Sequence, residues 1–134
     1  MSKTCVLLLI LFLLVPTSSI AQGSRSASIT ANKSWPQFWV RFNRAIKNRD
    51  RVALRRMMAD DFSDHGGGSP ADYYVTEVFS KEMRREYQRA LSSGTELIEY
   101  GEQPARFTRR KEHPKLIFEF GKDGRWRWIG LVGD

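Results

Sequence analysis

Two aromatic-rich segments near the end of the sequence constrain the fold most. Apolar residues alternate over 116–120 and again over 126–131, where Trp126 and Trp128 lie two positions apart. Such alternation is typical of β-strands that bury one face. The intervening segment 121–124 contains Asp-Gly, a strong signal for a tight hairpin. A sheet with this many large rings on one face needs helices to cover it, so the pattern predicts an α+β domain.

Segments with helical spacing precede these strands. Over 34–48, large aromatic residues recur on one stripe opposite basic residues, and Ser34 with Gln37 has the form of a capping box. The sequence therefore predicts an amphipathic helix that begins at Ser34. Asp50 is expected to cap a second, short helix that ends near Ala59.

A single long helix is predicted over 70–92, because apolar residues follow one face of this segment and Gly94 is suited to end a helix in the left-handed conformation. Shorter extended pieces are expected at 62–65, 97–98 and 105–108. Together with the hairpin, these segments predict N-terminal helices and one long helix packed on an antiparallel sheet that wraps onto them.

The first 21 residues have the order of a secretory signal peptide. Lys3 precedes an uninterrupted apolar run over 5–15, and small residues lead to Ala21, after which cleavage is expected. The apolar run is far shorter than the roughly 20 residues that a helix needs to span a bilayer. We therefore expect a secreted or periplasmic protein without stable insertion into a membrane.

The rest of the chain is expected to divide into an arm and one domain. Residues 22–33 are rich in serine and alanine and show no apolar periodicity, which predicts a flexible N-terminal arm. Residues 34–134 have the length of a single globular domain. The one cysteine, Cys5, lies in the leader, so this domain is expected to have no disulfide, thiol nucleophile or thiolate metal ligand.

The charge balance is strongly basic. Lysine and arginine number 22 against 15 acidic residues, for a formal net charge of +7. Arginine predominates, and its planar guanidinium fits phosphate and carboxylate groups. An anionic polymer (nucleic acid, an anionic polysaccharide or a lipid surface) is therefore one class of partner. The alternative is that the arginines are solvated helix faces paired with nearby acids. The residues considered for anion binding are Arg51, Arg55, Arg84, Arg85, Arg109 and Arg110.

The order of three segments carries a family resemblance. Segments 38–46 and 49–62 have the pattern of an opening helix, then a short helix that leads into a first strand, and 118–128 has the pattern of a closing hairpin. In this order they resemble the nuclear transport factor 2-like (NTF2-like) superfamily, also called the SnoaL-like or cystatin-like α+β cone. Within it, the chain is similar to small secreted members with the pattern of domain of unknown function 4440. The resemblance covers about residues 34–134.

The resemblance implies a conical pocket between the helices and a curved antiparallel sheet. It further implies that the pocket binds a small apolar ligand or that the domain forms a homodimer. Aromatic side chains are the candidates for lining this pocket, namely Trp39, Tyr87, Phe118, Trp126 and Trp128. The last two admit another interpretation, as a platform on which single-stranded nucleic acid or a sugar polymer stacks. The apolar area of these rings favours their burial.

Catalytic members of the superfamily transfer protons with an Asp, His and Tyr set, so any enzymatic activity is expected to be of this kind. Asp61, Asp64 and His65 stand beside a glycine-rich break and have the chemistry of a base and an acid. Strand alternation would place Asp61 and His65 on one face and Asp64 on the other. The alternative, which we favour, is a solvated loop in a binding protein. The spacing of the two histidines indicates no metal site, and we expect no metal and no cofactor.

Overall fold

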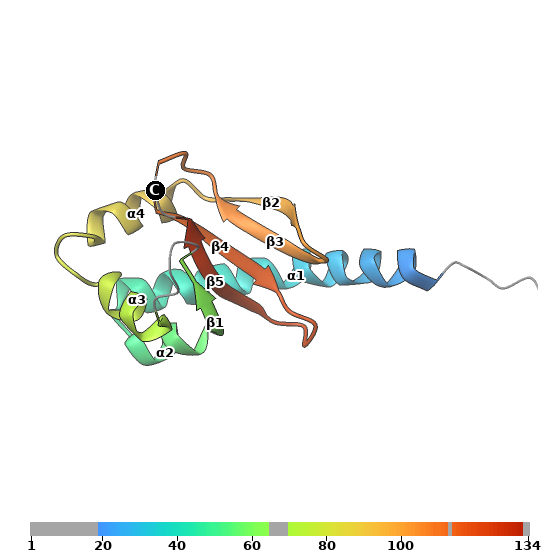
Figure 1. Cartoon of the computed structure of the whole chain (residues 1–134), viewed down its shortest axis with the longest axis horizontal. Coiled ribbons are helices and arrows are strands. Elements are labelled where there is room, and N and C mark those ends of the chain that lie inside the picture. The colour runs from blue at the N-terminus through green and yellow to red at the C-terminus, as the bar shows by residue number, and fades with distance from the viewer. Residues whose placement is uncertain (1–18, 65–69, 113, 133–134) are drawn as a thin grey trace, which may run out of the picture.

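The computed structural model describes residues 19–64, 70–112 and 114–132, so most of the predicted signal peptide and the candidate His65 lie outside the described residues. Helices and strands follow one another along the chain in a simple order (Figure 1). They are α1 (Ser19–Lys47), α2 (Arg51–Arg56), β1 (Met58–Ser63), α3 (Ala71–Glu77), α4 (Arg84–Ser92), β2 (Thr95–Tyr100), β3 (Gln103–Thr108), β4 (Lys115–Phe120) and β5 (Trp126–Val132).

The strands form one mixed sheet in the order β1-β5-β4-β3-β2. Hairpin connections make β2, β3, β4 and β5 antiparallel to their neighbours, whereas β1 pairs with β5 in parallel. The α+β class is confirmed, but the expectation of a wholly antiparallel sheet is wrong at this edge. Two helices and three strands separate β1 from β5 in the chain, so no hairpin sets their relative direction.

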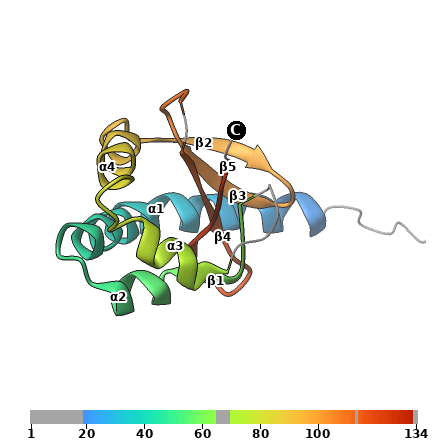
Figure 2. The ribbon, with the colours of Figure 1, turned by 60° about the vertical axis from the view of Figure 1, so that its left-hand side comes forward.

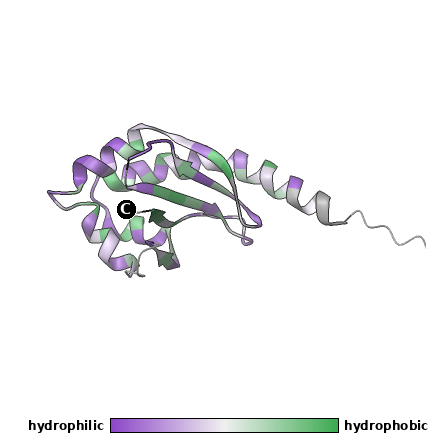
Figure 3. Ribbon diagram, turned by 45° about the horizontal axis from the view of Figure 1, so that its top comes forward, coloured by the Kyte–Doolittle hydropathy of each residue, from purple (hydrophilic) through white to green (hydrophobic). Residues whose placement is uncertain are grey.

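Helix α1 packs across one face of the sheet through its aromatic stripe (Figures 1 and 2). Trp35, Phe38 and Phe42 meet the ring of Phe118 on β4 with centroid distances of 5.4, 5.9 and 5.1 Å, all edge to face. The predicted helical stripe and its burial are therefore confirmed. The central strands are rich in hydrophobic residues, whereas the outward turns of the helices are mostly hydrophilic (Figure 3).

Helix α1 begins before the predicted start at Ser34 and includes residues 22–33, which were expected to form a flexible arm. The physical reason is tertiary contact. Ala31 is fully buried and its carbonyl accepts a hydrogen bond from Nε1 of Trp126 at 2.9 Å. Ser34 consequently lies inside the helix, where its hydroxyl donates to the carbonyl of Ala31 and caps nothing. Pro36 is accommodated within α1 as well.

The predicted long helix over 70–92 is two helices, α3 and α4, separated by a turn. At this turn the hydroxyl of Ser80 accepts a hydrogen bond from the backbone N–H of Met83, which competes with continued helix. The bend lets Val78 and Tyr87 both point into the core, where each is 1% exposed. The end of α4 is as predicted, with Gly94 at a φ of +71°.

Asp50 caps α2 as the sequence predicted, because its side chain accepts a hydrogen bond from the N–H of Ala53 at 2.9 Å. The helix ends at Arg56, earlier than the expected Ala59, since Met58 and Ala59 are already buried in β1. The tight turn between β4 and β5 is also confirmed, with Gly124 at a φ of +77°.

Candidate functional site

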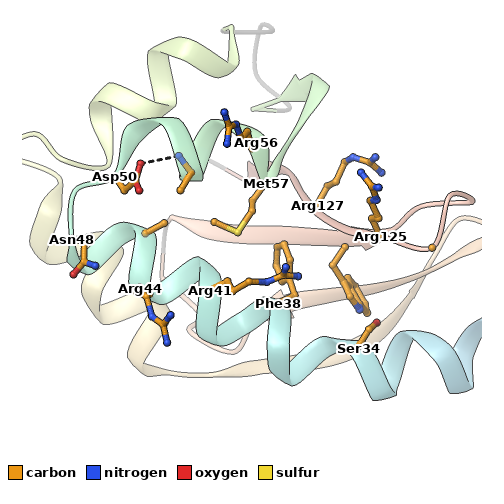
Figure 4. A pocket seen from close by; sticks show the side chains of 14 residues that line it. Ser34, Phe38, Arg41, Arg44, Asn48, Asp50, Arg56, Met57, Arg125 and Arg127 are labelled. Carbon is orange, nitrogen blue, oxygen red and sulfur yellow. Dashed lines mark hydrogen bonds between the residues drawn. The ribbon is translucent and has the colours of Figure 1, made fainter.

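A groove of about 640 Å³ opens between the C-terminal half of α1, helix α2 and the end of the β4–β5 hairpin (Figure 4). Apolar atoms of Phe38, Met57 and Trp126 form part of its wall. Its charged rim is almost wholly basic, and we call it the arginine groove. The basic residues that line it are Arg41, Arg44, Arg56, Arg125 and Arg127.

Local structure explains why these side chains meet. On α1, Phe38, Arg41 and Ala45 follow one another at helical spacing and line the same side of the groove. Arg56 lies in the last turn of the short helix that Asp50 caps. On the hairpin, Arg125 precedes β5 and Arg127 follows Trp126, whose own side chain turns into the core.

The groove is electrostatically unbalanced. Arg127 forms an ion pair with Asp123 at 2.5 Å, and this hydrogen bond and charge lower the pKa of Asp123 to about 2. The other four arginines have no ion-pair partner among the carboxylates of the described residues. Asp50, the acidic side chain in the lining, is engaged with the N–H of Ala53. The groove therefore presents a concentration of positive charge to solvent.

The arginines singled out from the sequence lie elsewhere and are dispersed. Arg55 pairs with Asp60 and Asp72, at 3.5 and 3.1 Å, and Arg110 pairs with Glu86 and Glu112, at 3.0 and 3.1 Å. Both are therefore largely neutralised. The remaining four are exposed, on α2, on α4 and directly after β3, so the six do not form one patch. These four are Arg51, Arg84, Arg85 and Arg109.

The aromatic residues predicted to line a ligand pocket mostly pack against other rings. Trp128 is fully buried, and its ring meets those of Phe42 and Phe62 edge to face at 5.7 and 4.8 Å. Tyr87 and Phe118 are equally enclosed, whereas Trp39 is half-buried. Among the five candidates, Trp126 borders the arginine groove. The space between α1 and the sheet is thus occupied by the protein's own aromatic side chains.

Of the candidate catalytic residues, the two described aspartates lie on different sides of the sheet. The carboxylate of Asp64 accepts a hydrogen bond from Tyr74 of α3 at 2.9 Å, on the side that the helices cover. Asp61 is exposed on the opposite side, near Glu119. Burial and the negative charge of Asp61 raise the pKa of Glu119. The structure does not bring Asp61 and Asp64 together, and nothing is described for His65.

A buried tyrosine links α3 and α4, the two parts of the predicted long helix, through a hydrogen bond. The hydroxyl of Tyr87 on α4 donates to Glu77 on α3 at 2.7 Å, and Tyr73 donates to the same carboxylate at 3.4 Å. Burial is the largest cause that raises the pKa of Tyr87 above its ordinary value, followed by the bond to Glu77. Tyr87 therefore remains protonated and acts as a structural donor.

Sequence reasoning missed the residues of the arginine groove. A signal was present, because Arg41 and Arg44 stand one turn apart on α1, and Arg125 and Arg127 flank Trp126. The segments become neighbours only once the hairpin packs beside α1 and α2, and this long-range contact has no local signature.

Known proteins share little with this chain. No family model matches the chain, and no curated protein matches its sequence. The chain is similar to a crystal structure of a candidate ketosteroid isomerase from Shewanella frigidimarina NCIMB 400, with 13% identity and a TM-score of 0.39 over 87% of this chain and 96% of that one. Helices packed on a five-stranded mixed sheet are consistent with the NTF2-like cone that the sequence resembles.

No helix among residues 19–64, 70–112 and 114–132 has the length and apolar character needed to cross a membrane. Over the same ranges, no group of three or more His, Cys, Asp or Glu side chains is placed to hold a metal ion.

Proposed function

We propose that this NTF2-like domain binds an anionic ligand through the arginine groove. The observation that carries the proposal is the gathering of four arginines without described acidic partners around one concavity of about 640 Å³. Arg55 and Arg110 differ from these four, because carboxylates of other segments offset their charge. Uncompensated cations in a concave surface raise the local concentration of anions and guide them to the site.

The chemistry of the groove favours phosphate or carboxylate groups. Each guanidinium offers a planar fork that binds two oxygens of such a group at once. Phe38, Met57 and Trp126 add limited apolar contact beside the charges. An apolar ligand inside the cone is the other reading of the family resemblance, and it would have to displace rings that now pack on one another. The order of charge, apolar run and small residues in the first 21 residues supports a secreted protein.

The test removes two charges from the groove without altering the fold. Arg41 and Arg44 are exposed, so changing both to Gln is expected to leave stability unchanged. Binding of a fluorescent three-nucleotide oligothymidylate, measured by anisotropy near 50 mM salt, is expected to weaken by about tenfold. The slope of log K against log salt should fall by about 1.4, because each lost phosphate contact on a single strand contributes about 0.7.

The matched control removes two exposed cations elsewhere. Arg109→Gln with Lys111→Gln changes the net charge equally but touches no groove residue. We expect this control to bind within about twofold of the unaltered protein, because long-range charge is screened over about 14 Å at 50 mM salt. Equal losses in the two double variants would show that binding depends on net charge alone, and the proposal would then be wrong.

Asp50→Asn gives the opposite prediction. Asparagine caps helices as well as aspartate does, so α2 should keep its stability. Of the lining residues in the described part of the chain, Asp50 alone carries a carboxylate, and the substitution removes this charge. Affinity for the same oligothymidylate is expected to rise by about two- to threefold, measured by the same titration. An unchanged or weaker affinity would contradict a site at this groove.

A further inference from the structure

A second basic groove lies on the other side of α1. It has a volume of about 520 Å³ and opens between the C-terminal end of α1 and helix α4. Among the residues that the structure describes, none that lines it is acidic. We call this concavity the second groove. Its polar side chains include Asn43, Lys47, Arg49, Arg84 and Gln88.

The cations of the second groove resemble the four arginines of the first groove that lack an ion-pair partner among the described residues. Lys47, Arg49 and Arg84 are exposed, and no carboxylate within the described ranges forms an ion pair with any of them. Arg49 has a φ of +55°, the left-handed region that favours glycine or asparagine. The described residues contain no other non-glycine with positive φ. A long basic side chain thus stands where the backbone conformation favours a small residue.

A row of cations joins the two grooves across the surface of α1. Arg41, Arg44 and Lys47 are three residues apart, so each lies about 4.5 Å further along the helix and about 60° back around it. Such a row crosses a helix obliquely. Accordingly, Arg41 and Arg44 line the arginine groove and Lys47 lines the second groove. All three are exposed, so positive charge crosses the surface of α1 from one groove to the other.

We propose that the two grooves form one track that binds a linear chain of phosphate groups over the C-terminal half of α1. This inference rests on the proposed function and specifies its ligand class. A small anion would satisfy one groove, whereas the uninterrupted row of cations matches a ligand whose charges repeat along its length. The described cations of the two grooves are Lys47 and seven arginines, four of which come from α2, α4 and the hairpin. Arginine binds phosphate through two oxygens at once.

The track makes binding depend on ligand length. We expect the affinity of the purified protein for single-stranded oligothymidylates to rise steeply between three and twelve nucleotides. Lys47→Gln with Arg84→Gln should lower the affinity for the twelve-nucleotide probe by about tenfold. The same variant should bind the three-nucleotide probe with an affinity within about twofold of the unaltered protein. Arg41→Gln with Arg44→Gln should weaken both probes. The Arg109→Gln and Lys111→Gln control should change neither.

The outcomes separate the two claims. The Arg41 and Arg44 variant could bind both probes weakly while the Lys47 and Arg84 variant binds both normally. In that case the arginine groove is the binding site and the proposal of a track is wrong. If the Arg41 and Arg44 variant binds the three-nucleotide probe normally, the proposed function itself is wrong.

A competition arm distinguishes sources of the phosphate chain. Inorganic polyphosphate with the same number of phosphates should displace the twelve-nucleotide probe if the track recognises phosphate groups alone. Displacement only by oligonucleotide would instead show that the ligand is a nucleic acid. Heparin that competes as well as either at matched charge would overturn the assignment to phosphate.

Discussion

Phe118→Ala is expected to lower the free energy of unfolding by about 3–5 kcal/mol, the usual cost of removing a buried ring. Phe118 is fully buried at the centre of the aromatic contacts between α1 and the sheet. It meets Trp35, Phe38 and Phe42 edge to face, and such pairs contribute beyond the area that they bury. Urea denaturation followed by tryptophan fluorescence measures the loss.

Phe118→Leu is the matched control, because it keeps most of the buried apolar volume and should cost roughly 1–2 kcal/mol. The alanine variant should also open an apolar cavity that binds a small aromatic probe, which the unaltered protein does not bind. A loss below about 1 kcal/mol on Phe118→Ala, with probe binding by the unaltered protein, would show an open pocket inside the cone. That outcome would favour an apolar ligand over the surface site.

Gly130→Ala is expected to cost about 3–4 kcal/mol, because there is no space for a side chain where β1 and β5 run in parallel. A Cβ at Gly130 would lie 2.1 Å from the backbone oxygen of Ser63. Backbone cannot yield as a flexible side chain can, so the two strands would have to separate. Nε1 of Trp128 donates to the carbonyl of Gly130 at 2.7 Å, so the shift would also disturb a buried tryptophan.

Gly94→Ala separates this clash from backbone strain. Gly94 has a φ of +71° but open space where a Cβ would lie. Its substitution should therefore cost only the strain of a left-handed alanine, about 1 kcal/mol. Equal losses for Gly94→Ala and Gly130→Ala in urea denaturation would contradict the close approach of β1 to β5.

The sequence predicted those features that depend on neighbouring residues. The aromatic stripe of α1, the cap at Asp50 and the hairpin with Gly124 each rest on local spacing or turn chemistry, and the structure contains all three. Features set by distant contacts were missed. The early start of α1 depends on Ala31 meeting Trp126, and the parallel edge depends on β1 returning beside β5.

The candidate site was harder to predict for the same reason. The arginine content indicated an anionic partner, but the arginine clusters along the sequence did not predict where the candidate site lies on the surface. Arg55 and Arg110, adjacent to other arginines in sequence, find acidic partners from distant segments. Arg56 and Arg125 stand far apart in sequence and come together at one groove. Charge neutralisation and charge gathering both depend on the tertiary fold.

The central claim is that the ligand binds at the arginine groove and not in the interior, which aromatic rings fill. The most direct test is to titrate the isotope-labelled protein with the twelve-nucleotide oligothymidylate and to measure the backbone amide chemical shifts. The largest changes are expected at 41–49, 53–57 and 124–127 and at the α4 positions 84 and 88 that line the second groove, with small changes at buried Tyr87 and Trp128. Changes centred on the buried residues would place the ligand inside the cone and contradict the account. Changes spread evenly over exposed arginines outside the two grooves would equally contradict it.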